Sequence, residues 1–435
     1  MAYIPRFLQF EGYETCDFQT STRDNVVYVD LTARAEKAYV CCRCSNPLEG
    51  VRGRHRLILR DLPLRAFQTL VRLWRRKGFC KHCKKVRSEK IAFIAKESPH
   101  FTQDYAWWLG TMCEFAPVSR VAEMVSEGNM TVRRIDLKRM QRMLKHYKIP
   151  EVTHIAVDEV YARKKSKFKD EDRDQRFFTV ISDLNTRRVI WVAESRKKAA
   201  LDQFFKLIGK EACQKIAVVA VDQHEAYGAS VKEHCKNAKV VWDKFHIIKN
   251  FEEAVNEVRK SLHGRLPSKS PILRLTRGKY RFTFLKKANR RDKDEAQNIE
   301  EVVKENEDFA ALEIIKERML SFFDCTDAAS AWEVMWEIGR WIRQKVAADV
   351  AAGKSQAFIP LVTWWENLAS GWATLKNYFE FPVTSSLAEG VNNVIKSLKR
   401  RSFGFRNMDY FRLKIMQVCG YLNSRYIKFP ELIGT

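Results

Sequence analysis

Between about residues 150 and 245 the hydrophobic residues fall into short continuous runs, whereas on either side they mostly recur at helical spacing. Each run is rich in β-branched or aromatic residues and is bounded by polar residues, which favours strands over helices. The runs are 155–160, 177–182, 188–192, 216–221 and 239–242. The pattern predicts three hairpin-linked strands followed by alternating helices and strands in one α/β sheet.

Two cysteine pairs predict a zinc ribbon at about residues 38–98. The pairs have the C-x₂-C spacing of zinc knuckles: Cys41 with Cys44, and Cys80 with Cys83. Four thiolates around one structural Zn²⁺ would supply folding energy to a small module. Cys42 and His82 are alternative ligands, and the alternative to a metal site is a set of unligated cysteines.

From about residue 99 to 150 the pattern predicts three helices. The first opens at 104–109, a short second one covers 119–126, and a turn containing Gly128 leads to a basic third helix at about 131–147. This order is typical of a helix-turn-helix, whose later helix enters the major groove of DNA. The alternative is an ordinary three-helix unit with a solvated basic face. The candidate DNA-contacting residues are Arg133, Arg134, Lys138, Arg139 and Arg142.

Two predicted strands lead to aspartates, and a third acid lies at the start of a predicted helix. These candidate catalytic residues are Asp158, Asp222 and Glu389. Mg²⁺ or Mn²⁺ prefers carboxylate oxygens, and a pair of such ions activates the attacking oxygen and stabilises the leaving oxygen in phosphodiester chemistry. Structurally, the aspartates could instead cap strand ends, and Glu389 could complete a capping box with Ser386.

Five other residues lie close to these acids in the predicted fold. Asp243 and His246 flank the start of the helix after the last strand and are candidates to support the metal site, although Asp243 could simply cap that helix. The alternative acids are Glu159, Asp183, Glu225 and Asp243 itself.

The chain carries 78 Lys and Arg against 53 Asp and Glu, a formal net charge of +25 with a pI near 9.6. This excess favours a polyanionic partner such as double-stranded DNA, because neutralised phosphates release counterions. It also occurs in ribosomal and membrane-surface proteins. Further candidate DNA-binding residues are Arg163, Lys164, Lys165, Lys167, Asn392, Asn393, Lys399, Arg400 and Arg401. No apolar stretch is long enough to predict a membrane span.

We therefore predict an α/β RNase H-like catalytic domain interrupted by an all-α insertion and preceded by a zinc ribbon and a helix-turn-helix. An amphipathic helix at about 408–422 is expected to close the catalytic domain. The expected segments are a lead-in (1–37), the zinc ribbon (38–98), the helix-turn-helix domain (99–150), the first catalytic part (151–250), the helical insertion (251–383) and the last catalytic part (384–435).

Several of these motifs, in this order, resemble the ISL3 family of insertion-sequence transposases of the DDE type. The two cysteine pairs and the run 57–63 resemble the family's zinc ribbon, and Val157-Asp158-Glu159 resembles its first catalytic block. Residues 221–227 and 241–246 resemble the second block, and 389–396 and 399–407 resemble the third. The resemblance covers about residues 38–423.

The resemblance implies a transposase that binds terminal inverted repeats and carries out two-metal strand cleavage and strand transfer, as a homodimer or higher oligomer on paired ends. It also implies a cytoplasmic, nucleoid-associated bacterial protein. Two other functions remain open from the residues alone: a sequence-specific DNA-binding regulator with an inactive RNase H-like fold, and a structure-selective nuclease.

Overall fold

A computed structural model describes residues 9–162, 173–223, 225–383, 386–402 and 404–428, except the side chains at 173, 175, 225 and 386–388. The chain forms two compact units. Unit 1 contains Met1–Lys148 and Arg400–Thr435, and unit 2 contains Ile149–Lys399. Among the described residues no helix combines the length and the apolar composition that a bilayer crossing requires.

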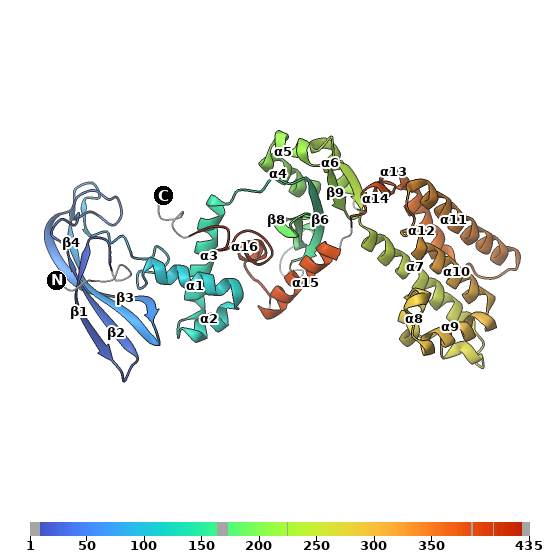
Figure 1. The fold of residues 1–435 in the computed structure, drawn as a ribbon, viewed down its shortest axis with the longest axis horizontal. Coiled ribbons are helices and arrows are strands. Elements are labelled where there is room, and N and C mark those ends of the chain that lie inside the picture. The colour runs from blue at the N-terminus through green and yellow to red at the C-terminus, as the bar shows by residue number, and fades with distance from the viewer. Residues whose placement is uncertain (1–8, 163–172, 224, 384–385, 403, 429–435) are drawn as a thin grey trace. The chain divides into compact units, whose positions relative to one another are not determined.

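A five-stranded sheet forms the N-terminal part of unit 1 (Figure 1). Its path runs β1-β2-β4-β3, and β2 pairs with β4 in parallel. Strand β5 pairs with the carboxyl-terminal end of β4, on the side of β4 opposite to β3. Val29, Leu59 and Val71 are fully buried on one face. The strands are β1 (Tyr13–Ser21), β2 (Val26–Ala33), β3 (Glu49–Leu64), β4 (Phe67–Cys80) and β5 (Lys85–Ser88).

The predicted lead-in is therefore part of the same sheet as the cysteine pairs. The sequence predicted one strand there, around Val26–Val29, whereas β1 and β2 form a hairpin. Strand β1 was missed because only Tyr13 of its nine residues is buried, so it lacks the apolar alternation that marks a half-buried strand.

Three helices follow the sheet, and a fourth from the far end of the chain packs on them. They are α1 (Gln103–Phe115), α2 (Val118–Met124), α3 (Asn129–His146) and α16 (Met408–Val418). On α16, Tyr410 Oη donates to Asp136 on α3 at 2.6 Å, and Lys414 Nζ donates to the Cys113 carbonyl on α1 at 2.6 Å. The expectation that this helix closes the catalytic domain is corrected: it belongs to unit 1. Its amphipathic pattern required an apolar partner but did not specify which one.

Unit 2 contains a second five-stranded sheet in the order β10-β9-β6-β7-β8. Strands β6, β7 and β8 are successively antiparallel, while β9 and β10 run parallel to β6. All five predicted strands are present. The elements are β6 (His154–Tyr161), η2 (Arg173–Arg176), β7 (Phe177–Asp183), β8 (Arg188–Glu194), α4 (Lys198–Ile208), α5 (Lys210–Lys215), β9 (Val218–Val221), α6 (Glu225–His234) and β10 (Lys239–Trp242).

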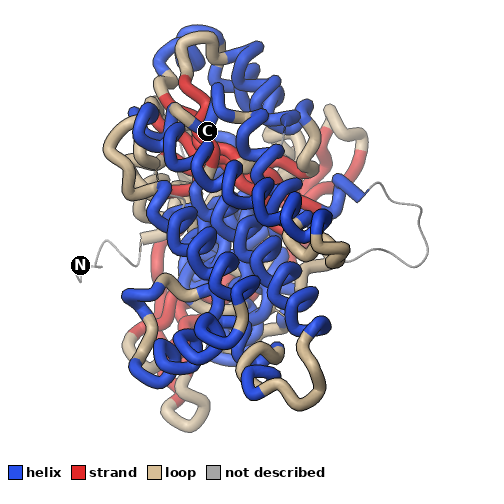
Figure 2. The backbone as a smooth tube through the Cα atoms, turned by 90° about the vertical axis from the view of Figure 1, so that its right-hand side faces the viewer, coloured by secondary structure: helices blue, strands red, loops and turns tan. Residues whose placement is uncertain are grey.

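Helices occupy the chain between β10 and the last helix of unit 2, as predicted; Figure 2 draws them in blue. Their bounds are α7 (Lys244–Arg265), η3 (Pro271–Leu273), η4 (Gly278–Tyr280), α8 (Arg281–Leu285), η5 (Ala288–Arg290), α9 (Lys293–Glu305), α10 (Glu307–Phe322), α11 (Ala328–Ala351), α12 (Ile359–Ser370), α13 (Trp372–Leu375), α14 (Asn377–Glu380) and α15 (Ser386–Arg401).

The helices between β10 and α15 also protect the edge of this sheet. Asn377 Nδ2 donates to the carbonyl of Val240 on edge strand β10 at 2.8 Å. Gly371 lies so close that a Cβ there would be 1.5 Å from the Trp242 ring. An unprotected edge strand invites pairing with another chain, so this contact has a stabilising and a protective role.

A prediction concerns the buried ion pair that joins α1 to α3. Arg139 Nη2 donates to Glu114 at 2.7 Å, with side-chain exposures of 1% and 6%. Glu114→Ala would leave the guanidinium buried without its counter-charge and should destabilise unit 1 by about 3–5 kcal/mol. Hydrogen exchange measured on peptides from α1 and α3 would report this loss. The exposed pair Arg120–Glu123 on α2 is the control, and Glu123→Ala should change stability by no more than about 1 kcal/mol.

Candidate active site

Two aspartates lie at adjacent positions on neighbouring parallel strands in unit 2. Val157 of β6 pairs with Val221, the last residue of β9, so Asp158 is the next residue within β6 and Asp222 directly follows β9. Each carboxylate accepts a hydrogen bond from the backbone N–H of the following residue at 2.6 Å. The strand pairing, which the sequence predicted, therefore holds two carboxylates side by side.

His246 lies among three carboxylates. It is on the first turn of α7, with Nδ1 3.6 Å from Asp222 Oδ1 and Nε2 3.9 Å from Asp158 Oδ1. Nε2 is also 3.6 Å from Asp243 Oδ2. Asp243 caps α7, since its Oδ1 accepts from the Phe245 N–H at 2.9 Å. The capping role and the position beside the aspartates are thus compatible.

Helix α15 is anchored to β6 at two points. Asn392 Nδ2 donates to Asp158 Oδ2 at 2.6 Å, and Lys399 Nζ donates to the Tyr161 carbonyl at 2.9 Å. Glu389 lies one turn before Asn392, and residues three apart share a helix face. Its carboxylate is exposed and makes no hydrogen bond or ion pair to the described residues. The structure thus brings the Glu389 helix, rather than the Glu389 carboxylate, into contact with Asp158.

The electrostatics of this site favour a bound cation. Burial raises the pKa of Asp158, and the neighbouring Asp222 charge raises it further. The Glu159 N–H, His246 and Asn392 act in the opposite direction. A carboxylate that is costly to ionise without a counter-charge gains stability from a metal ion, and the oxygen donors of Asp158 and Asp222 suit a hard divalent cation.

The alternative acids have structural partners. Glu159 accepts from Tyr227 Oη at 3.1 Å and lies 3.5 Å from Arg196. Asp183 accepts from the Asn185 N–H at 3.0 Å and so caps its turn. The Glu225 side chain lies outside the described residues.

The four predicted zinc ligands of unit 1 converge. The sulfur atoms of Cys41, Cys44, Cys80 and Cys83 all lie within 4.8 Å of one another. Cys44 Sγ is 3.5 Å from Cys80 Sγ and 3.6 Å from Cys83 Sγ. These distances approach the ~3.8 Å edge of a tetrahedron of sulfurs about 2.3 Å from zinc.

The surroundings of the sulfur atoms shift the pKa values of the cysteine thiols in opposite directions. The Asn46 backbone N–H lowers the pKa of the Cys44 thiol to about 6, whereas the interaction with Cys44 raises the pKa of Cys83 to about 12. Burial raises the pKa of Cys41, but hydrogen bonds from the Cys44 and Arg43 backbone N–H groups outweigh this effect and lower it overall. A bound dication would offset the repulsion among thiolates held this close together. Cys42 and His82 are exposed and do not belong to this group.

The predicted DNA-contacting residues of α3 divide between two faces. Arg134 and Lys138 are exposed. Arg139, however, is 1% exposed and paired with Glu114, which corrects the expectation that it faces DNA. It shares the inner face of the helix with Val132, Ile135 and Met143, as its spacing from them requires.

Two other residues of α3 that were predicted to contact DNA already interact with side chains of unit 1. Arg142 forms an ion pair with Glu97, and the Arg133 guanidinium lies 5.1 Å from the Tyr410 ring centroid. Arg133 and Arg142 are half-buried rather than fully exposed. Both residues therefore also connect α3 to neighbouring segments of unit 1.

The remaining candidate DNA-binding residues belong to α15 or lie outside the described part of the chain. Asn393, Arg400 and Arg401 are exposed on α15. Asn392, predicted to bind DNA, instead contacts Asp158; its spacing of three from Glu389 is the sequence signal that could have indicated this. Arg163, Lys164, Lys165 and Lys167 lie outside the described residues.

Comparison with known proteins identifies the relatives of this chain. Residues 155–415 match the ISL3 family model, described as "Transposase". The chain is 25% identical over 393 residues to the transposase for insertion sequence element IS1001 of Bordetella parapertussis, covering 89% of this chain and 90% of that protein. It is 32% identical over 88 residues, 20% of each chain, to the transposase for insertion sequence element IS1557 of Mycobacterium tuberculosis.

A pH-dependence prediction follows from the environment of Asp158. Because its pKa is raised, the folded protein retains a proton that the unfolded chain releases, and stability falls as the pH rises through the folded pKa. Without added divalent cation, Asp158→Asn should therefore raise the melting temperature at pH 7, by about 2–4 °C for each kcal/mol gained. The gain should shrink toward the ordinary aspartate pKa of about 3.9. Thermal unfolding across a pH series tests this; a variant less stable at pH 7 would contradict it.

Proposed function

The chain belongs to the ISL3 family of transposases, and from that premise we propose that it binds the terminal inverted repeats of an insertion sequence and catalyses metal-dependent strand cleavage and strand transfer. The observation that carries the proposal is the pairing of β6 with β9, which holds Asp158 beside Asp222, together with the Asn392 contact that anchors α15 there.

The catalytic domain is proposed to be RNase H-like. Three antiparallel strands followed by two strands parallel to the first, in the order β10-β9-β6-β7-β8, support this assignment. The helical insertion separates β10 from α15, which explains the 167-residue interval between Asp222 and Glu389.

Asp158, Asp222 and Glu389 are proposed to hold two Mg²⁺ or Mn²⁺ ions. When bound, such a pair activates the attacking oxygen and stabilises the leaving oxygen of the phosphodiester. Asn392 fixes the orientation of the Asp158 carboxylate through its amide, and Asp243 fixes the start of the helix that carries His246. Lys399 holds α15 against β6, which keeps the Glu389 turn near the aspartates.

Unit 1 is proposed to recognise the element ends. Helices α2 and α3 are assigned as a helix-turn-helix, with α3 entering the major groove of double-stranded DNA. Its exposed residues Arg134, Lys138 and Lys145 recur at spacings of four and seven, which places them on one outward stripe. The four cysteines are proposed to hold one structural Zn²⁺, with all positions filled by protein. Pairing of two ends requires a second copy of the chain.

Substitution of the acids tests the catalytic assignment. Asp158→Asn, Asp222→Asn or Glu389→Gln should each lower Mg²⁺-dependent cleavage of labelled element ends by more than ~100-fold, because each removes a metal ligand. Asn392→Ala should cost only about 10–100-fold, as is typical of a residue that orients a ligand. Binding to the ends should change by no more than a few-fold.

Two exposed residues provide controls: Glu211→Gln on α5 and Ser397→Ala on α15 should retain activity. An Asp158→Asn protein that cleaves at the wild-type rate would remove this acid from the site. Products also separate the functions: nicked ends without strand transfer would indicate a nuclease, and intact ends a binding protein.

The zinc assignment predicts one equivalent of zinc per chain by elemental analysis. Cys80→Ser should lose that zinc and expose β3 to β5 to hydrogen exchange, because metal binding and folding are coupled. Cys42→Ser and His82→Ala should retain the full equivalent. Retention of zinc by the Cys80 variant would contradict the four-cysteine site.

A further inference from the structure

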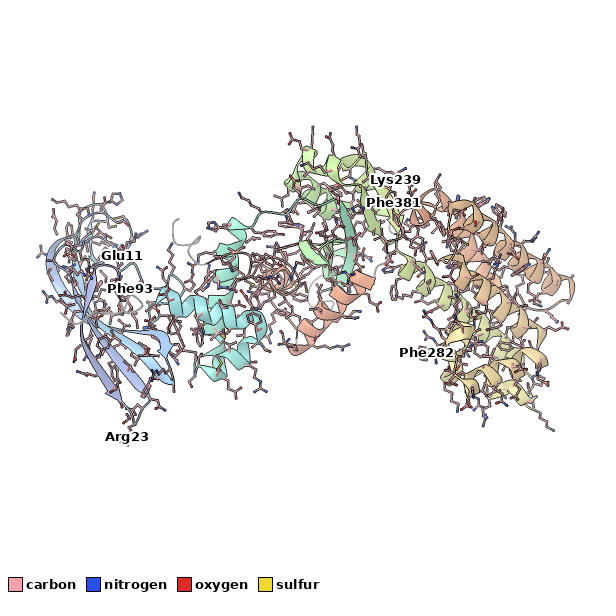
Figure 3. All side chains as sticks on the ribbon, viewed as in Figure 1. Glu11, Arg23, Phe93, Lys239, Phe282 and Phe381 are labelled. Atoms are coloured by element: carbon pink, nitrogen blue, oxygen red, sulfur yellow. The ribbon has the colours of Figure 1, made fainter. Side chains whose placement is uncertain are left out.

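The sheet of unit 1 has one covered face and one open face. Phe93, labelled in Figure 3, packs against Phe10 and Tyr13 on the covered face, with ring centroids 5.0 and 5.5 Å apart. Because side chains alternate along a strand, the residues next to the buried ones point to the open face. On β4 these include Arg72 and Trp74, because Val71 and Leu73 are buried.

Trp74 is the most exposed aromatic residue of this sheet. Its exposed fraction is 59%, and Arg56 lies directly opposite it on β3. Arg54 and Ile58, two residues to either side of Arg56, share its face, and Ile58 is 45% exposed. We call Trp74, Arg54, Arg56 and Ile58 the Trp74 face. It presents a flat aromatic surface bordered by two guanidinium groups.

The cations around the Trp74 face are not equivalent. Arg72 donates two hydrogen bonds to Asp30 and lies 4.5 Å from the Tyr28 ring centroid, and Arg76 is paired with Glu89. In contrast, Arg54 and Arg56 are exposed and form no ion pair with any described residue. Residues 13–88 contain 17 Lys and Arg but only 7 Asp and Glu, so the free cations lie in a positive field. Charge complementarity therefore selects an anionic partner.

The exposed indole ring restricts the class of anionic partner further. Bases within a duplex are stacked on one another, whereas an unpaired base offers both faces to a protein aromatic ring. Non-specific single-strand sites combine such stacking with a positively charged groove that follows the phosphates. Same-face residues on one strand are about 7 Å apart, so Arg54 and Arg56 present two cations in a row along the ribbon.

We propose that the Trp74 face binds single-stranded DNA, with an unpaired base stacked on the indole and the flanking phosphates paired with Arg54 and Arg56. The site extends the proposed function and rests on it for its biological substrate, because cleavage at element ends exposes unpaired strands. It is distinct from the α3 stripe, which is assigned to duplex DNA.

Binding by the full-length zinc-loaded protein, measured without added Mg²⁺, tests this site. Trp74→Ala should weaken binding of a single-stranded oligonucleotide by about tenfold to a hundredfold, while Trp74→Phe should retain most of the affinity. Arg54→Ala and Arg56→Ala should each reduce the slope of log affinity against log salt by about 0.7. Trp336→Ala, at an exposed tryptophan of unit 2, is the matched control.

Two outcomes would overturn the proposal. One is unchanged single-strand binding by Trp74→Ala protein that retains its zinc and its circular dichroism spectrum. The other is an equal loss of binding to a duplex of the same sequence, which would place the duplex on this face. Strand cleavage is measured separately, so wild-type protein that binds single strands but never cleaves would contradict the proposed function and leave this site intact.

Discussion

The parallel pairing of β6 with β9 is the constraint on which the proposed chemistry depends. It fixes Asp158 beside Asp222 through backbone hydrogen bonds, which are indifferent to the charge of the side chains. Two carboxylates held together at a partly buried position repel one another, and burial adds to the cost of ionising Asp158. The fold therefore maintains an arrangement that is unfavourable by itself and becomes favourable with cations. Asn392 and His246 compensate only part of that cost.

The sheet of unit 2 was largely predictable because its central strands are covered on both faces. Continuous apolar runs such as Val218–Val221 have few other interpretations when they are short and end at polar residues. The convergence of the cysteines was likewise predictable, since two C-x₂-C pairs constrain the chain locally. Strand β1 was not predictable in this way, because its side chains mostly face solvent and its register is set by β2.

Tertiary partners account for the other differences from the sequence-based expectations. Arg139 carries the same charge as Arg134, yet one is buried and the other exposed. Burial of Arg139 is tolerable because partners on α1, chief among them the Glu114 carboxylate, satisfy its guanidinium. Composition identifies α3 as basic but cannot separate cations that hold the unit together from cations that remain exposed and available to a partner. The same limit applies to the sheet, where Arg72 is neutralised by Asp30 and Arg56 is not.

The chain passes from unit 1 to unit 2 after Lys148 and returns at Arg400, within the last turn of α15. Unit 2 is consequently an insertion within the polypeptide that folds as unit 1, and α16 completes the packing of α1 and α3 only after all of unit 2 has been synthesised. A polypeptide that stopped at residue 399 would keep all three proposed metal-binding acids but lack the hydrogen bonds to Asp136 and Cys113. Truncation after residue 399 would thus weaken the packing of unit 1 before it altered the pairing of β6 with β9 in unit 2, so unit 1 can complete its fold only with residues that follow unit 2 in the chain.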